Sequence, residues 1–287
     1  MKLPFPKSIF LALILDFDET ITSRDTISYI ANLSYTLHPT TPPWSYFTSA
    51  YMNDYNHVQP DPSTLESYIS SFTTIEKASL ERVNARKVLS GIPQAALSNS
   101  PTDLQAPHYR HFMNAFKATH AAAVCRVVSL NWSKDLISGV SGFDKQDVVS
   151  NDLEFVDGVS TGVVTGAMYT GIEKLEAAKA AVPAFGVVEG YGIAVGDAVS
   201  DLPLLLTAGL GLVINPRASF YNVCSRFNIH VAPISSRTAL DGVDRKRVVY
   251  SVTGWEEIHR VLLGVEMGDT SGTRRTPDAA ETLFGWV

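Results

Sequence analysis

The chain has 287 residues, a formal net charge of −6 and the composition of an ordinary globular protein. This length allows a large buried core and exceeds that of most single domains, which predicts a core with an elaboration. The negative charge excludes a general electrostatic attraction to nucleic acid or to an anionic membrane surface, so a bound anion must be held by local groups.

The first residues, Met1–Lys7, are followed by an apolar run over 8–15. This pattern is similar to a secretory signal, but no small-residue cleavage site follows, and cleavage would remove an expected strand over 9–16. No stretch of the sequence reaches the apolar length of a membrane span. The chain has only two cysteines, Cys125 and Cys224, which argues against a disulfide scaffold and indicates a cytoplasmic protein.

The strand expected over 9–16 runs directly into two carboxylates, Asp16 and Asp18. Side chains two residues apart on an extended strand point the same way, so both acids emerge together at the carboxyl end of the strand. Like charges repel there and burial penalises both, which a bound cation would relieve. The alternative is a solvated strand end at which both acids cap a following helix.

Residues 22–102 lack a convincing buried strand and contain several helical stretches. A structureless loop of this length is uncommon inside a compact domain. We therefore predict a helical cap over 22–102, inserted into a core that comprises 1–21 and 103–287. Residues 92–101 are expected to be the linker that returns to the core, and a core helix is expected over 103–120.

The predicted cap is rich in aromatic side chains close to its first prolines. This group comprises Trp44, Tyr46, Phe47, Tyr51 and Tyr55, together with Met52. Packing inside a helical cap is the simpler interpretation. The alternative is that some of these side chains line a pocket, either as a cage for an amine or as a wall for an apolar organic phosphate.

From about residue 122 onward, short β-rich runs alternate with helical runs. This alternation predicts right-handed βαβ units and a doubly wound, mostly parallel α/β sheet, to which the strand over 9–16 also belongs. Strands are expected over 123–129, 147–150, 191–196, 210–214 and 229–232, and helices over 132–139, 171–182, 200–208 and 217–227. Residues 151–168 predict a hairpin beside the site entrance, and the polar tail from Gly268 is expected to be mobile.

Other segments also place chemically useful residues at the ends of strands or in helices. A second apolar strand ends in a glycine turn, after which Asp197 and Asp201 open a helix. Ser129 ends a β-branched run, and Lys174 lies in a helical segment. Ligands of open α/β sheets bind beyond the carboxyl ends of the strands, where Asp16, Ser129 and Asp197 all fall. Acids, a hydroxyl group and a lysine together suit a phosphate group.

These segments match, in order, the four motifs of the haloacid dehalogenase superfamily: Asp16-Phe-Asp18-Glu-Thr20, Ser129, Lys174, and Gly196-Asp197 with Asp201. The chain thus resembles this superfamily, which implies a Rossmann-like core with an inserted cap. The insertion after the first motif is similar to the type-1 cap of the phosphoserine phosphatase branch, and residues 151–162 are similar to the hairpin region of those enzymes.

The resemblance implies that Asp16 is a nucleophile that forms an aspartyl-phosphate, and that Asp18 is the general acid and then the general base. It implies that Mg²⁺ is bound by Asp16, the backbone carbonyl of Asp18 and Asp197, while Asp201 acts through water or orients the other ligands. The residues expected to bind phosphate or substrate are Thr20, Asp25, Ser129, Leu130, Asn131 and Lys174.

Departures from the phosphoserine phosphatase pattern bear on the substrate. Ser129-Leu-Asn131 lacks the glycine pair that follows the serine in those enzymes, so Asn131 is a candidate contact for substrate or phosphate. Ser200 stands where those enzymes usually have asparagine, which weakens any assignment of phosphoserine itself. Asp25 aligns with the acid that reads the substrate's amino group, and an N-cap role suits it equally.

The predicted function is therefore hydrolysis of a small organic phosphomonoester by a Mg²⁺-dependent phosphatase. One alternative is a phosphotransferase or mutase that uses the same intermediate, and another is a catalytically inactive binding protein on the same fold. The repelling acids argue against the inactive binding protein, because a site without turnover has no need of them. The expected partner is a small phosphate ester rather than nucleic acid or a membrane, and the protein is expected to be a monomer or a homodimer.

Overall fold

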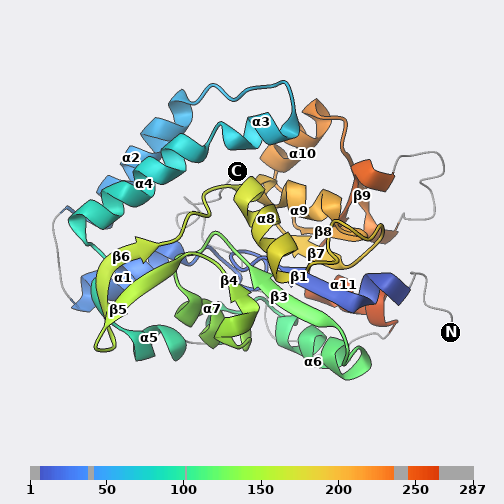
Figure 1. Cartoon of the computed structure of the whole chain (residues 1–287), viewed down its shortest axis with the longest axis horizontal. Coiled ribbons are helices and arrows are strands. Elements are labelled where there is room, and N and C mark those ends of the chain that lie inside the picture. Colours follow the sequence, from blue (N-terminus) through green and yellow to red (C-terminus); the bar gives the residue numbers. More distant parts are fainter. Residues whose placement is uncertain (1–6, 38–41, 101, 236–244, 265–287) are drawn as a thin grey trace.

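The computed structural model describes residues 7–37, 42–100, 102–235 and 245–264. Within these residues, the core is a seven-stranded sheet in the order β4-β3-β1-β7-β8-β10-β9, and each neighbouring pair is parallel (Figure 1). Its strands are β1 (Ala12–Leu15), β3 (Val124–Val128), β4 (Val148–Val149), β7 (Ile193–Gly196), β8 (Leu210–Ile214), β9 (His230–Pro233) and β10 (Val248–Val252).

Helices cover both faces of this sheet because the side chains of its strands alternate between two apolar clusters. In β1, Leu13 and Leu15 belong to one cluster, whereas Ala12 and Ile14 belong to the other. The first cluster includes side chains of α6 (Tyr109–Thr119), α7 (Lys134–Ser141) and α11 (Trp255–Leu263), and the second those of α8 (Gly171–Ala181), α9 (Leu202–Thr207) and α10 (Ala218–Arg226). The predicted doubly wound α/β fold is therefore confirmed.

Strand β1 lies between β3 and β7, which places three strand ends side by side. The chain leaves these strands at Asp16, Ser129 and Asp197. The N–H of Asp16 donates to the carbonyl oxygen of Val195 at 2.9 Å, so the hydrogen bonding between β1 and β7 continues to the first acid. Residues from distant parts of the sequence are thereby brought to one edge of the sheet.

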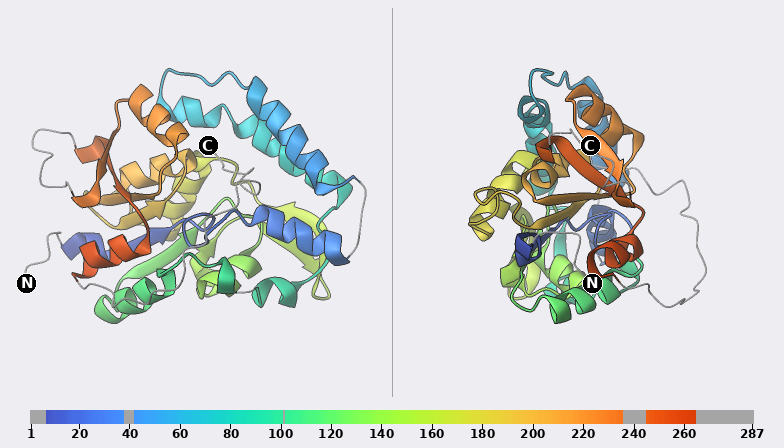
Figure 2. Two further views of the ribbon diagram at one scale, coloured as in Figure 1. Left: turned by 180° about the vertical axis from the view of Figure 1, so that it is seen from behind. Right: turned by 90° about the vertical axis from the view of Figure 1, so that its right-hand side faces the viewer.

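The segment that follows β1 is mostly helical. It comprises α1 (Ile27–Leu37), α2 (Trp44–His57), α3 (Leu65–Ser70) and α4 (Thr73–Arg86). Figures 1 and 2 show α2, α3 and α4 as an arch that leads from the side of α1 to α10. At the far end of the arch, Tyr68 of α3 contacts Phe227 edge to face, with 5.5 Å between ring centroids.

The expectation that this segment lacks a strand is wrong at its end. The expected linker contains part of β2 (Ser90–Pro93) and all of α5 (Gln94–Ser98). Strand β2 pairs antiparallel with β6 (Val159–Thr165), which pairs with β5 (Asp152–Val156), the other strand of the predicted hairpin. Gly91 and Pro93 weaken the local strand pattern of β2, and its partner lies far along the chain.

Other expectations differ from the structure in detail. The helix expected over 103–120 begins only at Tyr109, because Pro107 precedes it and His108 has a φ of 66°. The strand expected over 147–150 is limited to β4. Beyond the last predicted strand, β10 (Val248–Val252) and α11 (Trp255–Leu263) were not predicted, and β10 separates β8 from β9 in the sheet. The polar tail lies outside the described residues.

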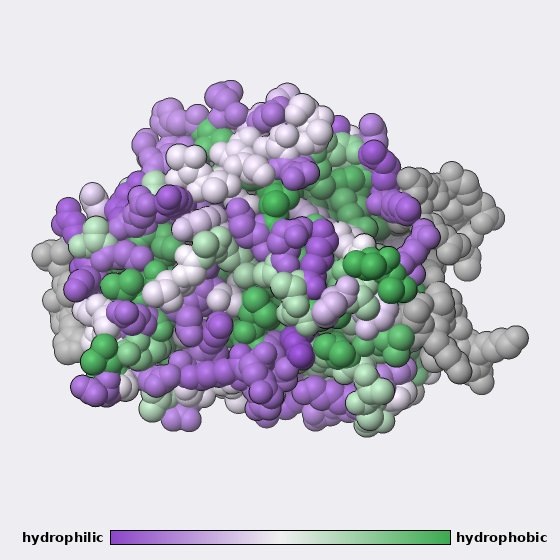
Figure 3. All heavy atoms as spheres, viewed as in Figure 1, coloured by the Kyte–Doolittle hydropathy of each residue, from purple (hydrophilic) through white to green (hydrophobic). Residues whose placement is uncertain are grey.

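The face drawn in Figure 3 carries hydrophilic side chains interspersed with smaller hydrophobic groups. Among the large hydrophobic side chains, Val187 is the most exposed of those described, at 81%. Across the described ranges, no helix combines the length and the hydropathy that crossing a membrane requires.

Candidate active site

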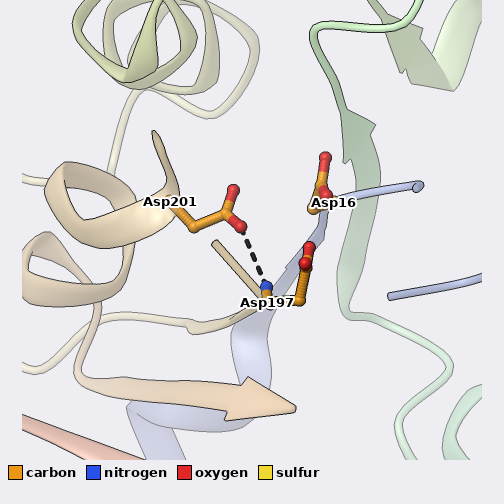
Figure 4. Close-up of side chains that lie close together, drawn as sticks. All are labelled: Asp16, Asp197 and Asp201. Atoms are coloured by element: carbon orange, nitrogen blue, oxygen red, sulfur yellow. Dashed lines mark hydrogen bonds between the residues drawn. The ribbon is translucent and has the colours of Figure 1, made fainter. Parts of the chain in front are cut away.

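The carboxyl ends of β1, β3 and β7 lead into a pocket of about 420 Å³, part of which is open to solvent. Its lining consists of Asp16, Asp18, Glu19, Asp25, Ile27, Ser129, Leu130, Asn131, Lys174, Asp197, Ala198 and Ser200. Carboxylate oxygens of Asp16, Asp197 and Asp201 all lie within 4.8 Å of one another (Figure 4). The two strand-to-acid junctions of the sequence therefore meet at a single site.

Asp201 is fixed by the turn that follows β7. Its Oδ2 accepts the N–H of Asp197 at 2.9 Å and the N–H of Ala198 at 3.0 Å, the first of which Figure 4 shows. A Cβ atom at Gly196 would lie 2.4 Å from the carboxylate of Asp201. Glycine at this position therefore allows the strand end and the carboxylate to approach each other.

Lys174 links two of the acids. Its Nζ donates to Oδ1 of Asp16 at 2.5 Å and to Oδ1 of Asp201 at 2.6 Å, and its side chain is fully buried in α8. Helix α8 can approach this closely because it begins at Gly171, where a Cβ atom would lie 2.0 Å from the carbonyl oxygen of Ser200. Burial acts to lower the pKa of Lys174, but the charges of Asp16 and Asp201 raise it overall, so the amine is cationic.

Asp18 is held by hydrogen-bond donors from two segments. Its Oδ1 accepts the N–H of Thr26 at 2.8 Å and the hydroxyl of Thr26 at 2.6 Å, and its Oδ2 accepts Nδ2 of Asn131 at 2.8 Å. Asn131 is itself oriented by the N–H of Ser133, which donates to its Oδ1 at 3.0 Å. Burial raises the pKa of Asp18, and the donors lower it in part. This balance suits a group that both gives and takes a proton.

The pocket holds more negative charge than Lys174 can neutralise. Burial raises the pKa of Asp16 to about 7, although Lys174 acts to lower it. Burial also raises the pKa of Asp197 well above its usual range, and the charges of Asp201 and Asp16 add to this effect. The pKa of Asp25 is likewise raised well above its usual range by burial and by the charge of Asp18. Additional positive charge in this pocket would stabilise the charged forms of these carboxylates.

The donor set suits a hard divalent cation such as Mg²⁺, because it consists of carboxylate oxygens. Oδ1 of Asp201 accepts from Lys174, and Oδ2 accepts from the backbone. By contrast, among the described residues the structure gives Oδ2 of Asp16 and Oδ2 of Asp197 no hydrogen bond. The residues therefore fit an ion held by Asp16 and Asp197, with Asp201 orienting its neighbours.

The other predicted site residues differ in their placement. Ser129, Leu130 and Asn131 line the pocket, and Oγ of Ser129 accepts the N–H of Asn131 at 3.3 Å. Asp25 also lines it, and its Oδ1 accepts the N–H of Ile27 at 3.4 Å, so it contacts the start of α1 from the position before the N-cap residue Thr26. Thr20 does not line the pocket but is fully buried, and its hydroxyl donates to Oδ1 of Asp197 at 3.4 Å.

The sequence analysis did not single out Thr26, Glu19 or Arg217. A hydroxyl residue immediately before a helix is an N-cap signal, which was available for Thr26. Glu19 lines the pocket and forms an ion pair with Arg217, which immediately precedes α10. No local pattern links these two residues, because they are far apart in the sequence.

The aromatic residues of the cap serve two purposes. Trp44 and Phe47 line a small, mostly apolar cavity, as expected for packing. Tyr46 is exposed. Tyr51 and Tyr55, however, line a second pocket of about 370 Å³ that shares Leu130 and Ser200 with the first. Some members of this aromatic group therefore pack inside the helical segment, and others border the second pocket.

Comparison with known proteins agrees with this geometry. A family model for haloacid dehalogenase-like hydrolases matches residues 13–206. A CTO1 family protein of Schizosaccharomyces pombe is 24% identical over 277 residues, which cover 87% of this chain and 98% of that protein. A phosphoserine phosphatase of Mycobacterium tuberculosis is 37% identical over 76 residues, 26% of this chain and 19% of that protein.

A solved structure shows the same fold. The HAD family hydrolase of Salmonella enterica serovar Typhi matches with a TM-score of 0.55 and 17% identity, over 92% of this chain and 74% of its own. The family match extends over more than half of the chain and includes Asp16, Asp18, Ser129, Lys174, Asp197 and Asp201. The chain therefore belongs to the haloacid dehalogenase-like hydrolases, and its partial matches to phosphoserine phosphatases agree with the predicted branch.

Proposed function

We propose that this hydrolase is a Mg²⁺-dependent phosphatase that cleaves a small organic phosphomonoester through an aspartyl-phosphate on Asp16. One observation carries the proposal: the carboxylates of Asp16, Asp197 and Asp201 converge within 4.8 Å beside the buried cation of Lys174. This arrangement offers a nucleophile, an ion-binding pair and a fixed positive charge in one pocket. The relative named as a phosphoserine phosphatase supports the same class of reaction.

Asp16 and Asp197 would hold the ion, together with the backbone carbonyl of Asp18, and Asp201 would keep Lys174 and the turn after β7 in place. When bound, Mg²⁺ neutralises charge on the phosphate and on the acids around it. Lys174 supplies further positive charge, and the hydroxyl of Ser129 can donate to a phosphoryl oxygen. These groups act where negative charge accumulates in phosphoryl transfer.

The chain's own residues account for both displacements. In the first, an oxygen of Asp16 forms a bond to phosphorus while the bond from phosphorus to the ester oxygen breaks, and Asp18 donates its proton to the leaving alkoxide. In the second, Asp18 takes a proton from water, whose oxygen displaces Asp16 from phosphorus. Thr26 and Asn131 hold Asp18 in the same orientation for both steps.

The test is a panel of phosphate esters assayed for release of inorganic phosphate with Mg²⁺ and with EDTA. We expect Mg²⁺-dependent turnover of at least one ester, and its loss in Asp16→Asn, which keeps the shape of the side chain but removes the nucleophile. Asp103→Asn, at an exposed acid away from the pocket, is the matched control. A folded wild-type protein that releases phosphate from no ester would contradict the proposal.

The same assay separates hydrolysis from phosphoryl transfer. A phosphotransferase or mutase would give a phosphorylated product when a hydroxyl acceptor is added, whereas a phosphatase gives inorganic phosphate. The cytoplasmic location and the state of monomer or homodimer stay predictions.

A further inference from the structure

A second pocket adjoins the proposed catalytic pocket. It comprises about 370 Å³ of space, part of which is open to solvent, and lies between α2, α3 and α4 on one side and residues of the core on the other. Leu130 and Ser200 line both pockets. A molecule whose phosphate lies beside Asp16 can therefore direct its organic part toward the second pocket.

The side of this pocket that is formed by the helical segment is an aromatic surface. Tyr55 stacks on Phe72 with 5.3 Å between ring centroids, and Tyr68 meets Phe72 edge to face at 5.7 Å. Tyr51 extends the group, with its ring 6.1 Å from that of Tyr55. These four side chains come from α2, from α3 and from the turn between α3 and α4. Aromatic faces of this kind attract cations and planar rings.

A buried acid lies in the same pocket. Glu76 of α4 is 8% exposed, and its Oε1 accepts the hydroxyl of Tyr51 at 2.7 Å. Burial raises the pKa of Glu76 to about 8, and the hydrogen bond from Tyr51 offsets only part of the effect. The nearest basic residues of α4 pair elsewhere, Lys77 with Glu81 and Arg82 with Asp54.

This acid is difficult to explain by packing alone. With no cation beside it, the raised pKa of Glu76 keeps the group mainly protonated at neutral pH, whereas a cation bound next to it would lower this pKa and favour the carboxylate. The aromatic surface by itself would suit a neutral ring, but it gives no reason for an acid among the rings. An aromatic surface and a buried acid that a neighbouring cation would ionise are, by contrast, two features in one pocket that favour an organic cation.

We infer that Tyr51, Tyr55, Tyr68, Phe72 and Glu76 bind a positively charged organic group on the leaving alcohol of the substrate. This inference rests on the proposed phosphatase function and names its substrate class: phosphate esters of alcohols that carry an amine or a quaternary ammonium group. The rings contact the cation, and Glu76 supplies the opposite charge.

The test uses two pairs of esters that differ in charge but not in shape. One pair is O-phosphotyramine and 4-propylphenyl phosphate, and the other is phosphocholine and 3,3-dimethylbutyl phosphate. The first pair carries its charge beyond a ring and the second on a compact group. In at least one pair, we expect kcat/KM to be about tenfold or more higher for the cationic member.

The charge of Glu76 is tested within the same pairs. Glu76→Gln keeps the size of the side chain and an acceptor for Tyr51 but removes the charge. We expect the ratio of kcat/KM between cationic and neutral members to fall to within about threefold of unity in this variant. Both values of kcat/KM in the ratio come from the same protein, so a loss of activity that affects both esters equally leaves the ratio unchanged. Glu81→Gln, at an exposed acid of the same helix, should keep the wild-type ratio.

Equal kcat/KM within both pairs would overturn the inference, and so would a preference that Glu76→Gln leaves unchanged. If the folded protein hydrolyses no ester at all, the proposed function fails, and binding decides this inference separately. Tyramine and choline should then raise the Tm of the wild-type chain more than 4-propylphenol and 3,3-dimethylbutanol do, and Glu76→Gln should abolish the difference. Equal shifts in Tm would overturn the inference in that case.

Discussion

The orientation of Asp18 depends on hydrogen bonds from two side chains. One of them, Asn131, follows the second motif and is therefore distant in the sequence. Its Nδ2 donates to Oδ2 of Asp18, while Thr26 holds the other oxygen. We expect Asn131→Ala to lower kcat about tenfold or more, because the proposed acid loses the donor that fixes its second oxygen. Phosphate release under saturating substrate measures this effect. Asn99→Ala, at the exposed end of α5, is the control, and an unchanged kcat in Asn131→Ala would contradict the proposed role.

Glu76 makes the stability of the protein depend on pH. Its pKa rises from 4.5 to about 8 on folding. Between these values the folded chain binds a proton that the unfolded chain releases, so this group's contribution to the free energy of unfolding falls as pH rises. We expect Glu76→Gln to gain stability relative to wild type over this range, by on the order of 1–4 kcal/mol at pH 8 compared with pH 5.

Urea denaturation of both proteins across this pH range measures the difference. The contributions of Asp16, Asp18 and Asp197 are common to the two proteins and cancel in the comparison. The hydroxyls that face Glu76 do not titrate in this range, since burial raises the pKa of Tyr51 and raises that of Tyr55 to about 12. Parallel stability curves would show that Glu76 keeps its ordinary pKa.

At the level of secondary structure, the start of α8 determines where Lys174 lies. Thr170 and Glu173 form a capping box at this end, and Gly171 lies against the backbone of Ser200. We expect Gly171→Ala to destabilise the protein by about 2 kcal/mol or more, because its Cβ would clash with a backbone oxygen rather than with a flexible side chain. We also expect a larger relative loss of activity than of folded protein, since α8 must move away and take Lys174 with it.

Ala180→Gly, in the same helix and exposed, provides the comparison. It should cost about 1 kcal/mol through backbone entropy alone and leave phosphatase activity unchanged. Thermal unfolding and kcat are measured for both variants. Equal activity in Gly171→Ala and wild type would mean that the close approach of α8 to Ser200 does not position Lys174.

Most elements with a strong local pattern were predicted from the sequence, but β10 and α11 were missed although their patterns are clear, and β2, which depends on a distant partner, was missed as well. The strands before Asp16 and Asp197 are apolar runs that end in acids, and both were predicted, although the strand expected over 9–16 is limited to Ala12–Leu15 because Lys7–Leu11 form a 3-10 helix. Strand β2 has only four residues, including Gly91 and Pro93, and it is a strand only because β6 pairs with it. The position of β10 between β8 and β9 is likewise a property of the sheet that no local pattern specifies.

The candidate site follows the same division. Strand ends and family motifs indicated most of the residues that line the first pocket. Glu76 was not indicated, because on α4 it reads as one more acid of a helix with exposed charges. Its role depends on α2 and α3, which bring Tyr51 and Tyr68 to the same pocket. Tertiary contacts, not spacing in the sequence, distinguish this glutamate from Glu81.

At the scale of the whole molecule, the helical segment is attached to the rest of the chain at both ends of the arch. At one end β2 pairs with the hairpin, and at the other Tyr68 contacts Phe227 and lies under the guanidinium of Arg226 at 5.6 Å. Each pocket is lined by residues of both the helical segment and the core, including Asp25 and Ser129 in the first pocket and Tyr55 and Gly171 in the second. The proposed site for the leaving group is therefore complete only when the helical segment is docked on the core.

The cluster of acids also predicts how an ion affects the stability of the whole molecule. Without an ion, buried carboxylates whose pKa values are raised oppose folding, and an ion bound only in the folded state stabilises it. At about a hundredfold excess of Mg²⁺ over its Kd, we expect the Tm to rise by about 5 °C or more. Sodium chloride at the same ionic strength should not reproduce the rise.

Asp197→Asn identifies the site of this effect without any measurement of turnover. The substitution removes one of the repelling carboxylates, so the metal-free variant should be at least as stable as metal-free wild type, while the rise in Tm with Mg²⁺ should be lost. Asp103→Asn should keep the full rise, because its carboxylate is exposed and lies outside the pocket. An equal rise in Asp197→Asn and wild type would place the ion elsewhere, and a lower metal-free Tm in Asp197→Asn would mean that Asp197 stabilises the fold rather than opposing it.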